Sequence, residues 1–586
     1  MPISLAPIVK FSGQQLANTW IEALIDLRVE REFQVPGRCT LRFVDPGYAL
    51  LASGTVTLGM PIVISAADGG ELIEAEVTSI SAEQREAANP QLVVVGHDKS
   101  HRMGRPTVVT TYQQMAYSDV VSKVVSSYGL TAATDSTQLK LEYLLQVDSD
   151  LGLVTEMARR AGFDWWVEGK TFNFKKPAAG TTVNLTLHQD LRSFSVRASG
   201  HYPDEFTVDG WDRKQQAQVT ATAQTSSAAI KASSNVATLV ASPKGKFGQA
   251  KVLTAGIAAS NQDEATQLSV ALAQRAASSA VTARGVADGS SQIKPGVTVK
   301  VTDAGPLSGT YPVTKVEHVY STGTAYLTKF VAGDRRPTSL VDMLAAPSAA
   351  PTAATAHAGL VVGEVTNIND PNQAGRVKVR YPGLSSTDES AWARLLAVGG
   401  GSSRGTVFIP EVGDEVLVAF EGGDPRQPVV LGGLYGDKSA IPAWAVQDGK
   451  VTARGITSRL GHVMTLSDGS KPEDQFILLQ LAGNQHTFKM SKKPQVDLTV
   501  PSGTPVNITA GSTKIAFADD GSISIEGLNV TIKAKEKFQV ECLNGSVKAS
   551  AQLALEASTQ AGLKGATIQI EGSAMTAVKG GIVQIN

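Results

Sequence analysis

Short stretches of alternating apolar and polar residues run through the first half of the chain. They occupy residues 27–45, 61–68 and 74–83, each with glycine or proline nearby, and they predict β-strands. The same pattern returns at 294–302 and 308–320. This part of the protein is therefore expected to be mainly β.

Helical periodicity interrupts the strands. Residues 117–130 repeat valines at i, i+1, i+4 and i+5, with Ser118 placed to cap a helix and Gly129 to end it. Residues 151–174 predict a helix that ends at Gly162 and continues into a hairpin. These two stretches add a helical layer to the predicted strands.

A third helix is predicted over residues 260–281, where Asn261 and Glu264 are spaced as a capping box. Before it, residues 214–242 are rich in Ala, Ser and Thr and predict a long surface excursion. Residues 345–358 consist of small residues, proline and one histidine, and predict a linker that buries no core.

Behind the linker the pattern predicts a small barrel. Glycine and proline turns separate five short strands, a rhythm typical of a closed barrel of the OB type. The predicted strands are residues 360–368, 375–382, 390–398, 415–423 and 427–436.

From about residue 455 the sequence becomes a monotonous alternation, broken by Gly or Asn. Each strand of this tail has one apolar and one polar face, and a single layer cannot bury the apolar face by itself. The tail is therefore expected to roll into a solenoid or to wind with identical copies. The main apolar positions are Val530, Ile532, Phe538, Val540, Val547, Leu553, Leu555, Ile568 and Ile570.

Composition and charge narrow the function. The 586 residues should form several domains, and 53 basic against 54 acidic residues give no general attraction to nucleic acid. Cys39 and Cys542 are too far apart in sequence to indicate a disulfide framework. The first residues lack the zones of a secretory signal, so we expect a chain that is made in a reducing cytosol without a signal peptide.

Residues 408–436 gather carboxylates that could form an acid/base pair or a cation cage. Their positions flank glycines in turns, where carboxylates stay hydrated and accept local backbone N–H groups, and Arg426 is close enough to pair with Asp424. We therefore expect turn residues, and single substitution of Glu411, Asp414, Glu421 or Asp424 by Asn or Gln should change the stability by no more than ~0.5 kcal/mol. The acids are Glu411, Asp414, Glu415, Glu421 and Asp424.

Other candidates for chemistry are weak. His97, Asp98 and His101 could ligate a metal if helical, but a junction between a strand and a loop is favoured. Cys542 shares parity with Val540 and is expected to be a small buried hydrophobe. No catalytic motif is recognisable, so no catalytic residue, metal site or cofactor is predicted.

The mixed N-terminal region, the small barrel and the alternating tail follow one another along the chain. In this order they resemble a VgrG-type spike of contractile injection systems, related to phage tail hub and spike proteins. The stretches ARRAGFDWWVEGKTFNF, DEFTVDGWD and KPGVTVKVTDAGPLSGTYPVTKVEHVY resemble tail-hub domains. GEVTNINDPNQAGRVKVRYP and AWARLLAVGGG resemble the spike OB domain, and the tail ending in GGIVQIN resembles a trimeric β-helical needle.

This resemblance implies a mainly β, multidomain fold with hub β-barrels carrying helical insertions, an OB barrel and a C-terminal trimeric β-helix. It divides the chain into a tail-hub domain (1–344), the linker, an OB domain (359–440), a connector (441–455) and a needle (456–586). The apolar tail positions above would then form the trimer core. The protein would be a structural spike; a spike-borne enzyme such as a cell-wall hydrolase is the alternative, and no inserted domain of that kind is expected.

The implied partners are two further copies of the chain, the inner tube protein, baseplate proteins, a PAAR-like tip protein, effector cargo and, transiently, a target membrane. The tip protein is expected on exposed strand ends, where glycines allow three chains to approach closely. The expected tip-binding residues are Gly580, Gly581, Ile582, Val583, Ile585 and Asn586. Phage, type VI and extracellular particles all remain open as the host system.

Overall fold

The structure is a computed structural model of the chain, and its residues form two compact units, Met1–Ala440 and Ile441–Asn586. The predicted linker and Asn586 lie outside the described residues. The described residues are 6–86, 88–178, 180–200, 202–212, 215–225, 233–236, 247–254, 259–335, 359–382 and 387–585.

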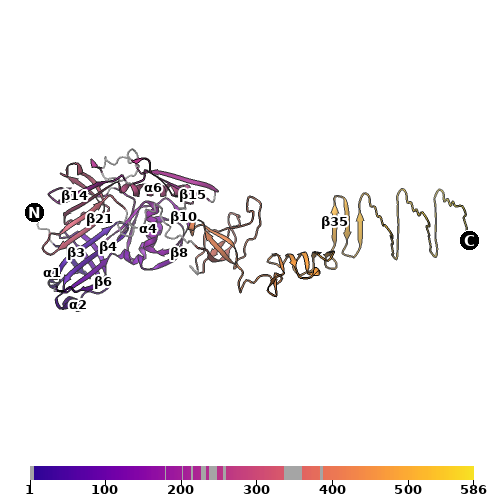
Figure 1. Ribbon diagram of the computed structural model, residues 1–586, viewed down its shortest axis with the longest axis horizontal. Coiled ribbons are helices and arrows are strands. Elements are labelled where there is room, and N and C mark those ends of the chain that lie inside the picture. The colour runs from indigo at the N-terminus through magenta and orange to yellow at the C-terminus, as the bar shows by residue number, and fades with distance from the viewer. Residues whose placement is uncertain are drawn as a thin grey trace. The chain divides into compact units, whose positions relative to one another are not determined.

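A 14-stranded sheet organises the N-terminal part of the first unit (Figure 1). Its main path follows the order β14-β19-β22-β21-β3-β4-β7-β6-β5-β1-β2, while β13, β17 and β20 pair beside it. The strands are β1 (Ile8–Phe11), β2 (Gln14–Gln15), β3 (Leu24–Glu32), β4 (Val35–Val44), β5 (Pro61–Ser65), β6 (Glu71–Glu83), β7 (Gln91–His97), β13 (Thr182–Thr186), β14 (Leu191–Ala198), β17 (Ser233–Ser234), β19 (Val281–Asp288), β20 (Thr298–Thr302), β21 (Gly309–Ser321) and β22 (Leu327–Ala332).

This sheet surrounds two separate cores. One contains Leu27 and Ile64, and the other contains Val299 and Phe330. The pairing of β21 with β3 joins the two parts of the sheet. The alternation seen in the sequence thus places one face of each strand in a core. Two short helices, α1 (Asn18–Ala23) and α2 (Ala49–Ala52), also belong to this region.

Smaller sheets and three longer helices complete the hub region. Helices α3 and α4 pack with β11 and β12 around a core that includes Trp165 and Phe172, while α6 packs against β15 and β16. The elements are β8 (Thr107–Ala116), α3 (Tyr117–Ser126), β9 (Thr131–Thr134), β10 (Lys140–Ser149), α4 (Asp150–Ala161), β11 (Asp164–Glu168), β12 (Thr171–Lys175), β15 (Glu205–Asp212), β16 (Ala217–Gln224), β18 (Lys251–Thr254) and α6 (Gln262–Ser278).

The start of α3 differs from the prediction. Its N-cap is Ala116, whose N–H donates to the Asp119 carboxylate at 3.3 Å, and Ser118 lies inside the helix. Ser118 instead pairs with Thr137, which accepts its N–H at 3.1 Å. The prediction of Ser118 as the cap is wrong because tertiary contacts with a later loop outweigh its local preference.

The other two helices begin and end close to their predicted signals. Helix α4 ends at Ala161, and Gly162 follows with φ +71°, a conformation that favours glycine. At α6 the Asn261 side chain accepts the Glu264 N–H, as predicted, but Glu264 accepts the N–H of Ser260 rather than that of Asn261.

The Ala-, Ser- and Thr-rich stretch 214–242 is not all surface excursion. Its first part forms β16, in which Val219, Ala221 and Ala223 are buried at alternate positions. The expectation of an excursion is wrong there because Val219 and Ala221 pack in one buried cluster with Ala265 and Leu268 of α6. Residues 226–232 and 237–242 of the stretch lie outside the described residues.

The five predicted barrel strands are confirmed. They form one sheet in the order β24-β23-β26-β27-β25, and the alternating Val416, Val418 and Phe420 face its core. The strands are β23 (Val361–Asn367), β24 (Lys378–Arg380), β25 (Arg394–Leu395), β26 (Glu415–Phe420) and β27 (Pro428–Gly433).

The second unit contains three antiparallel sheets. A hairpin of β28 and β29 comes first, followed by the five-stranded meander β30 to β34 and the three-stranded sheet β35 to β37. The strands are β28 (Val446–Gln447), β29 (Lys450–Val451), β30 (Ala453–Thr457), β31 (Val463–Asp468), β32 (Gln475–Gln480), β33 (Thr487–Ser491), β34 (Gln495–Thr499), β35 (Val506–Ala510), β36 (Thr513–Phe517) and β37 (Ile523–Glu526).

After Glu526 the described residues form no further helix or strand. Figure 1 shows this part of the chain running back and forth in extended segments. We call residues 527–585 the needle stretch.

Candidate functional site

One face of the meander β30–β34 is apolar and uncovered within the described chain. Across the strands Ile456 lies opposite Met464, and Leu479 lies opposite both Met464 and Phe488. The row ends at Leu498, which lies opposite Phe488, and its five residues line a hollow of about 570 Å³. We call the whole set the apolar sheet face: Ile456, Met464, Leu466, Ile477, Leu479, Phe488, Met490, Val496 and Leu498.

The side chains of this face are between 37% and 65% exposed, and Phe488 is the most covered of them. Soluble monomers rarely present a contiguous apolar patch of this kind, so such a patch marks a contact with another molecule. The neighbouring residue Thr457 has the opposite parity in β30 and lies on the other face of the sheet.

The needle stretch is even less covered. The nine residues predicted as a trimer core are between 49% and 80% exposed in the single chain. The predicted tip residues Ile582 and Ile585 are 90% and 89% exposed. Cys542 is exposed, so its predicted burial is wrong for one chain alone, because no other segment of the described chain covers it.

The backbone of the needle stretch is unpaired as well. The last strand pairing joins Lys514 to Glu526, and between Gly527 and Ile585 the described residues make no backbone–backbone hydrogen bond. Main-chain N–H and C=O groups in an extended chain are normally paired across strands. Both the apolar side chains and the backbone of this stretch are therefore open to pairing with another chain.

A 15-residue repeat organises the needle stretch, and the strand-by-strand sequence interpretation missed it. Glu526, Glu541, Glu556 and Glu571 follow one another at this interval, each directly after an apolar residue. A second apolar residue lies three positions before each glutamate, as Phe538 does before Glu541. The regular glutamate spacing is the signal that could have found the repeat.

The acids of 408–436 do not share one environment. Asp414 accepts the N–H of Glu411 at 2.9 Å in an exposed turn, and Glu421 forms an ion pair with Arg394. Asp424, by contrast, is 5% exposed. The interpretation as hydrated turn residues is therefore wrong for Asp424.

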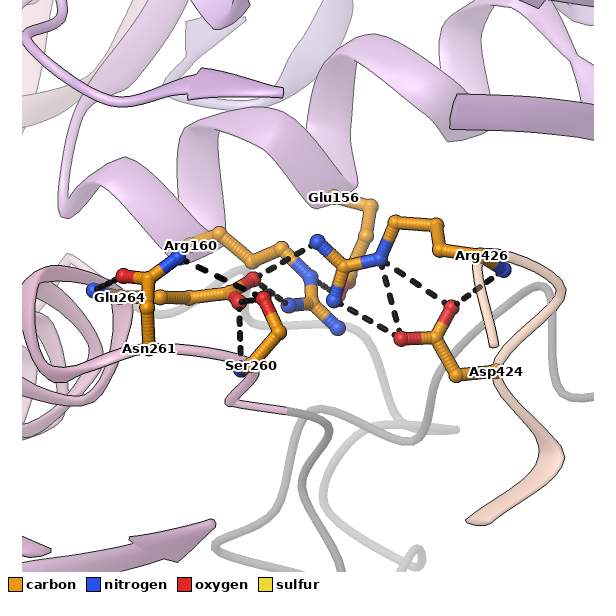
Figure 2. A network of polar contacts seen from close by, with 7 residues as sticks. All are labelled: Glu156, Arg160, Ser260, Asn261, Glu264, Asp424 and Arg426. Carbon is orange, nitrogen blue, oxygen red and sulfur yellow. Dashed lines mark hydrogen bonds and ion pairs between the residues drawn. The ribbon is translucent and has the colours of Figure 1, made fainter. Parts of the chain in front are cut away.

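Asp424 belongs to a buried chain of ion pairs between the barrel and two hub helices (Figure 2). Arg426 lies 2.9 Å from Asp424 and 2.9 Å from Glu264 of α6. Arg160 of α4 lies 3.1 Å from Glu264 and 3.1 Å from Glu156. The side chains of these five residues are at most 12% exposed, and we call them the junction network.

Glu264 is the centre of the junction network. The Glu264 carboxylate also accepts hydrogen bonds from the Ser260 N–H at 2.9 Å and from the Ser260 hydroxyl at 2.8 Å. Figure 2 shows the carboxylate in contact with Arg160, Arg426 and Ser260. Burial favours the neutral acid, but Arg426 and Arg160 outweigh it and hold the pKa of Glu264 below its ordinary value. Glu264 is therefore an ionised structural anchor.

Glu156, at the end of the network, behaves differently. Burial raises the pKa of this carboxyl despite the nearby guanidinium of Arg160. All the carboxylates of the network face arginines. Within the described part of the chain, no group of three or more His, Cys, Asp or Glu side chains is placed to hold a metal ion.

The histidine pair of the hub lies at the junction between strand and loop that the sequence favoured. His97 ends β7, and Asp98 caps a short 3-10 helix by accepting the N–H of Ser100 at 2.9 Å. Asp98 also accepts the N–H of Gly37, and the two imidazole rings are 6.1 Å apart. The group thus connects strand ends in the hub.

Membrane-spanning helices are not found in the described residues: none is both long and apolar enough to cross a bilayer.

Comparison with known proteins identifies the barrel. Residues 361–435 match the family described as the type VI secretion system/phage-baseplate injector OB domain. A second match, to an Alg8 N-terminal domain, covers residues 70–322. The matched range leaves out β3, β4 and β22, which pair with strands inside the range. The match therefore covers only part of the 14-stranded sheet.

Several relatives among characterised proteins are named as spike proteins. The type VI secretion system spike protein VgrG5 of Pseudomonas aeruginosa is 44% identical over 75 residues, which is 12% of this chain and 10% of that protein. VgrG3 of Vibrio cholerae is 42% identical over 80 residues, 13% of this chain and 8% of that protein. The chain therefore matches only about a tenth of these relatives' length.

The fold as a whole has a solved counterpart. A chain in the structure of a Francisella PdpA–VgrG complex in a half-lidded state superposes with a TM-score of 0.51 at 8% identity, over 84% of this chain and 88% of that one. At this identity the likeness concerns the fold. Together with the OB match it confirms the resemblance to VgrG-type spike proteins, and the chain carries a baseplate OB domain similar to theirs.

Proposed function

We propose that the protein is the central spike of a contractile injection machine, in which three copies connect the inner tube and baseplate to a membrane-puncturing needle. The observation that carries this proposal is the needle stretch, whose backbone and apolar side chains are unpaired in one chain. It follows a baseplate-type OB domain in the same chain.

The domain assignment proposed with this function keeps the hub at 1–344, the OB domain at 359–440 and the needle at 456–586. The hub contacts the tube, and the apolar sheet face and the needle stretch contact equivalent surfaces in the other two copies. The assembly forms in the bacterial cytoplasm and leaves the cell as part of an injected or secreted particle. The number of three rests on the likeness to VgrG-type spikes.

The mass of the full chain in solution tests the assembly. Light scattering should give three times the chain mass of 61.3 kDa. A stable folded monomer at micromolar concentration would contradict the proposal, because the exposed apolar positions of the needle stretch would then have no partner.

A PAAR-like tip protein is proposed to dock on the end of the needle stretch. Gly580 and Gly581 allow close approach of the chains, and Ile582 and Ile585 offer apolar contact. Deleting residues 580–586 should abolish co-purification of a co-expressed tip protein while the trimer persists. Unchanged binding would place the docking surface elsewhere.

A purely structural role is part of the proposal. One relative is named as an actin cross-linking toxin, VgrG1 of Vibrio cholerae, but the 68 matched residues make up 6% of that protein and carry no argument for its activity here. The purified protein should therefore neither hydrolyse peptidoglycan nor cross-link actin. Turnover that one point mutation abolishes would support the spike-borne enzyme instead.

A further inference from the structure

Charges alternate along the needle stretch in step with its extended segments. The glutamates of the 15-residue repeat are separated by lysines that also follow apolar residues, and at these positions glutamate and lysine alternate every seven or eight residues, with Lys535, Glu536 and Lys537 as further charges between two of them. In chain order the series is Glu526, Lys533, Glu541, Lys548, Glu556, Lys564, Glu571 and Lys579.

These charges lie on the polar face of their segments. Gln539 donates to Glu541, and Gln569 donates to Glu571, so each glutamate shares a face with the residue two positions before it. The apolar Phe538 has the opposite parity. The apolar positions can therefore face a common core while the charged ones point away from it.

The eight residues have no ionic partner in the described chain. All of them are exposed, and none takes part in an ion pair among the described residues. Apart from Glu526, which ends the paired strand β37, their segments also lack backbone partners among the described residues. Whatever strand pairs with a segment of the needle stretch must come from another molecule.

We infer that copies of this chain pair so that each glutamate-bearing segment lies beside a lysine-bearing segment of another copy, which forms a Glu–Lys ladder along the outside of the needle. The inference rests on the proposed self-assembly. It assigns a second copy as the occupant because the charge series is complementary to itself when shifted by one segment.

The ladder would fix the register of the copies. Both kinds of segment carry apolar residues, so apolar burial alone distinguishes poorly between pairings that differ by one segment. Such a slip places glutamate beside glutamate and lysine beside lysine, and like charges directly opposite each other destabilise adjacent strands. The charges thus select one set of pairings from two that are similar in apolar contact.

Charge reversal in the full-length protein tests the ladder. The variant with Glu526, Glu541, Glu556 and Glu571 all changed to Lys should need about tenfold more protein for half-assembly in low salt. The complementary variant changes Lys533, Lys548, Lys564 and Lys579 to Glu, and its assembly should be weakened to a similar degree. Mixing and refolding the two variants should give hetero-oligomers that assemble better than either variant alone, because segments of opposite charge then pair between unlike copies.

A matched control carries the same change in net charge. It replaces Glu22, Glu86, Glu473 and Glu536, which are exposed and lie outside the periodic positions, by Lys. Its assembly should equal that of the wild type. At 1 M NaCl all variants should converge, because charges are then screened beyond about 3 Å.

The outcomes separate the inference from the proposed function. A wild-type monomer would overturn the self-assembly on which both rest. A wild-type trimer with an equally stable glutamate-to-lysine variant would overturn the ladder and leave the spike intact. Equal weakening in the control, or mixed variants that assemble no better than either variant alone, would also overturn the ladder.

Discussion

At the residue scale, the clearest difference from the sequence interpretation is Asp424. Local sequence shows an acid that follows two glycines, with an arginine two positions later, which is typical of a turn. The residue that determines its environment, Glu264, lies 160 positions earlier and reaches it only through Arg426 (Figure 2). The local Asp424–Arg426 pair was predictable, but its burial against a helix of the hub was not.

The junction network should contribute strongly to the stability of the first unit. Replacing Glu264 by Gln leaves Arg160 and Arg426 buried 3 Å or so from a neutral group, and removing one partner of a buried ion pair costs ~3–5 kcal/mol. Asp424→Asn should cost ~1–3 kcal/mol. Urea denaturation followed by tryptophan fluorescence measures both, and Glu411→Gln is the exposed control, expected within ~0.5 kcal/mol. Wild-type stability in Glu264→Gln would contradict this role.

The same residue predicts a pH dependence. The pKa of Glu264 is lower in the folded state than its ordinary value, so its contribution is complete above the unfolded pKa and is lost as pH falls through the folded pKa. Glu156 has a raised pKa and therefore acts in the opposite sense as pH rises through that range.

The stability of the wild type relative to Glu264→Gln should therefore shrink as pH falls below about 4.3, the ordinary value for a glutamic acid. Urea midpoints measured from pH 6 to pH 3 provide the comparison. A constant difference between the two proteins across that range would show that Glu264 is not ionised in the fold.

At the element scale, alternation predicted the strands well where one face of the strand enters a core. Val416, Val418 and Phe420 of β26 are an example, and the helix end at Gly162 follows equally from local signals. β16 was not predicted, because its buried face consists mainly of alanine, which carries little pattern. Its burial depends on the distant helix α6 and thus on tertiary structure.

The apolar sheet face gives a prediction at this scale. Ile456→Glu places a charge on that face and should prevent or strongly weaken assembly, because a buried unpaired carboxylate is costly. Thr457→Glu introduces the same side chain one position later, on the other face, and should assemble like the wild type. Light scattering of both variants gives the comparison. Equal trimer content in the two would show that this face is not an interface.

At the scale of the whole molecule, the sequence predicted the order of hub, barrel and alternating tail, and the OB match agrees with the barrel. What it did not reveal is how the tail is paired, because the partner strands of the needle stretch are absent from the chain itself. A pattern within one chain indicates which face is apolar. It does not specify a register between copies unless a longer period, such as the 15-residue repeat, is recognised.

The repeat therefore predicts which changes in needle length are tolerated. Deleting residues 542–556 removes one whole repeat and joins Glu541 to Ala557, the same neighbour that Glu556 has in the intact chain. The alternation of glutamate and lysine is then unbroken, and the three chains should assemble with a shorter needle. Deleting only residues 542–549 removes Lys548 and brings two glutamate-bearing segments into succession.

The shorter deletion should be the more harmful one, although it removes fewer apolar residues. Each Glu–Lys pair across strands contributes only ~0.2–1 kcal/mol, but the misplaced segments repeat in all three copies and shift every later pairing. Thermal dissociation followed by light scattering ranks the two variants. If stability instead falls in proportion to the number of residues removed, the needle has no 15-residue register, and its copies associate through apolar contact alone.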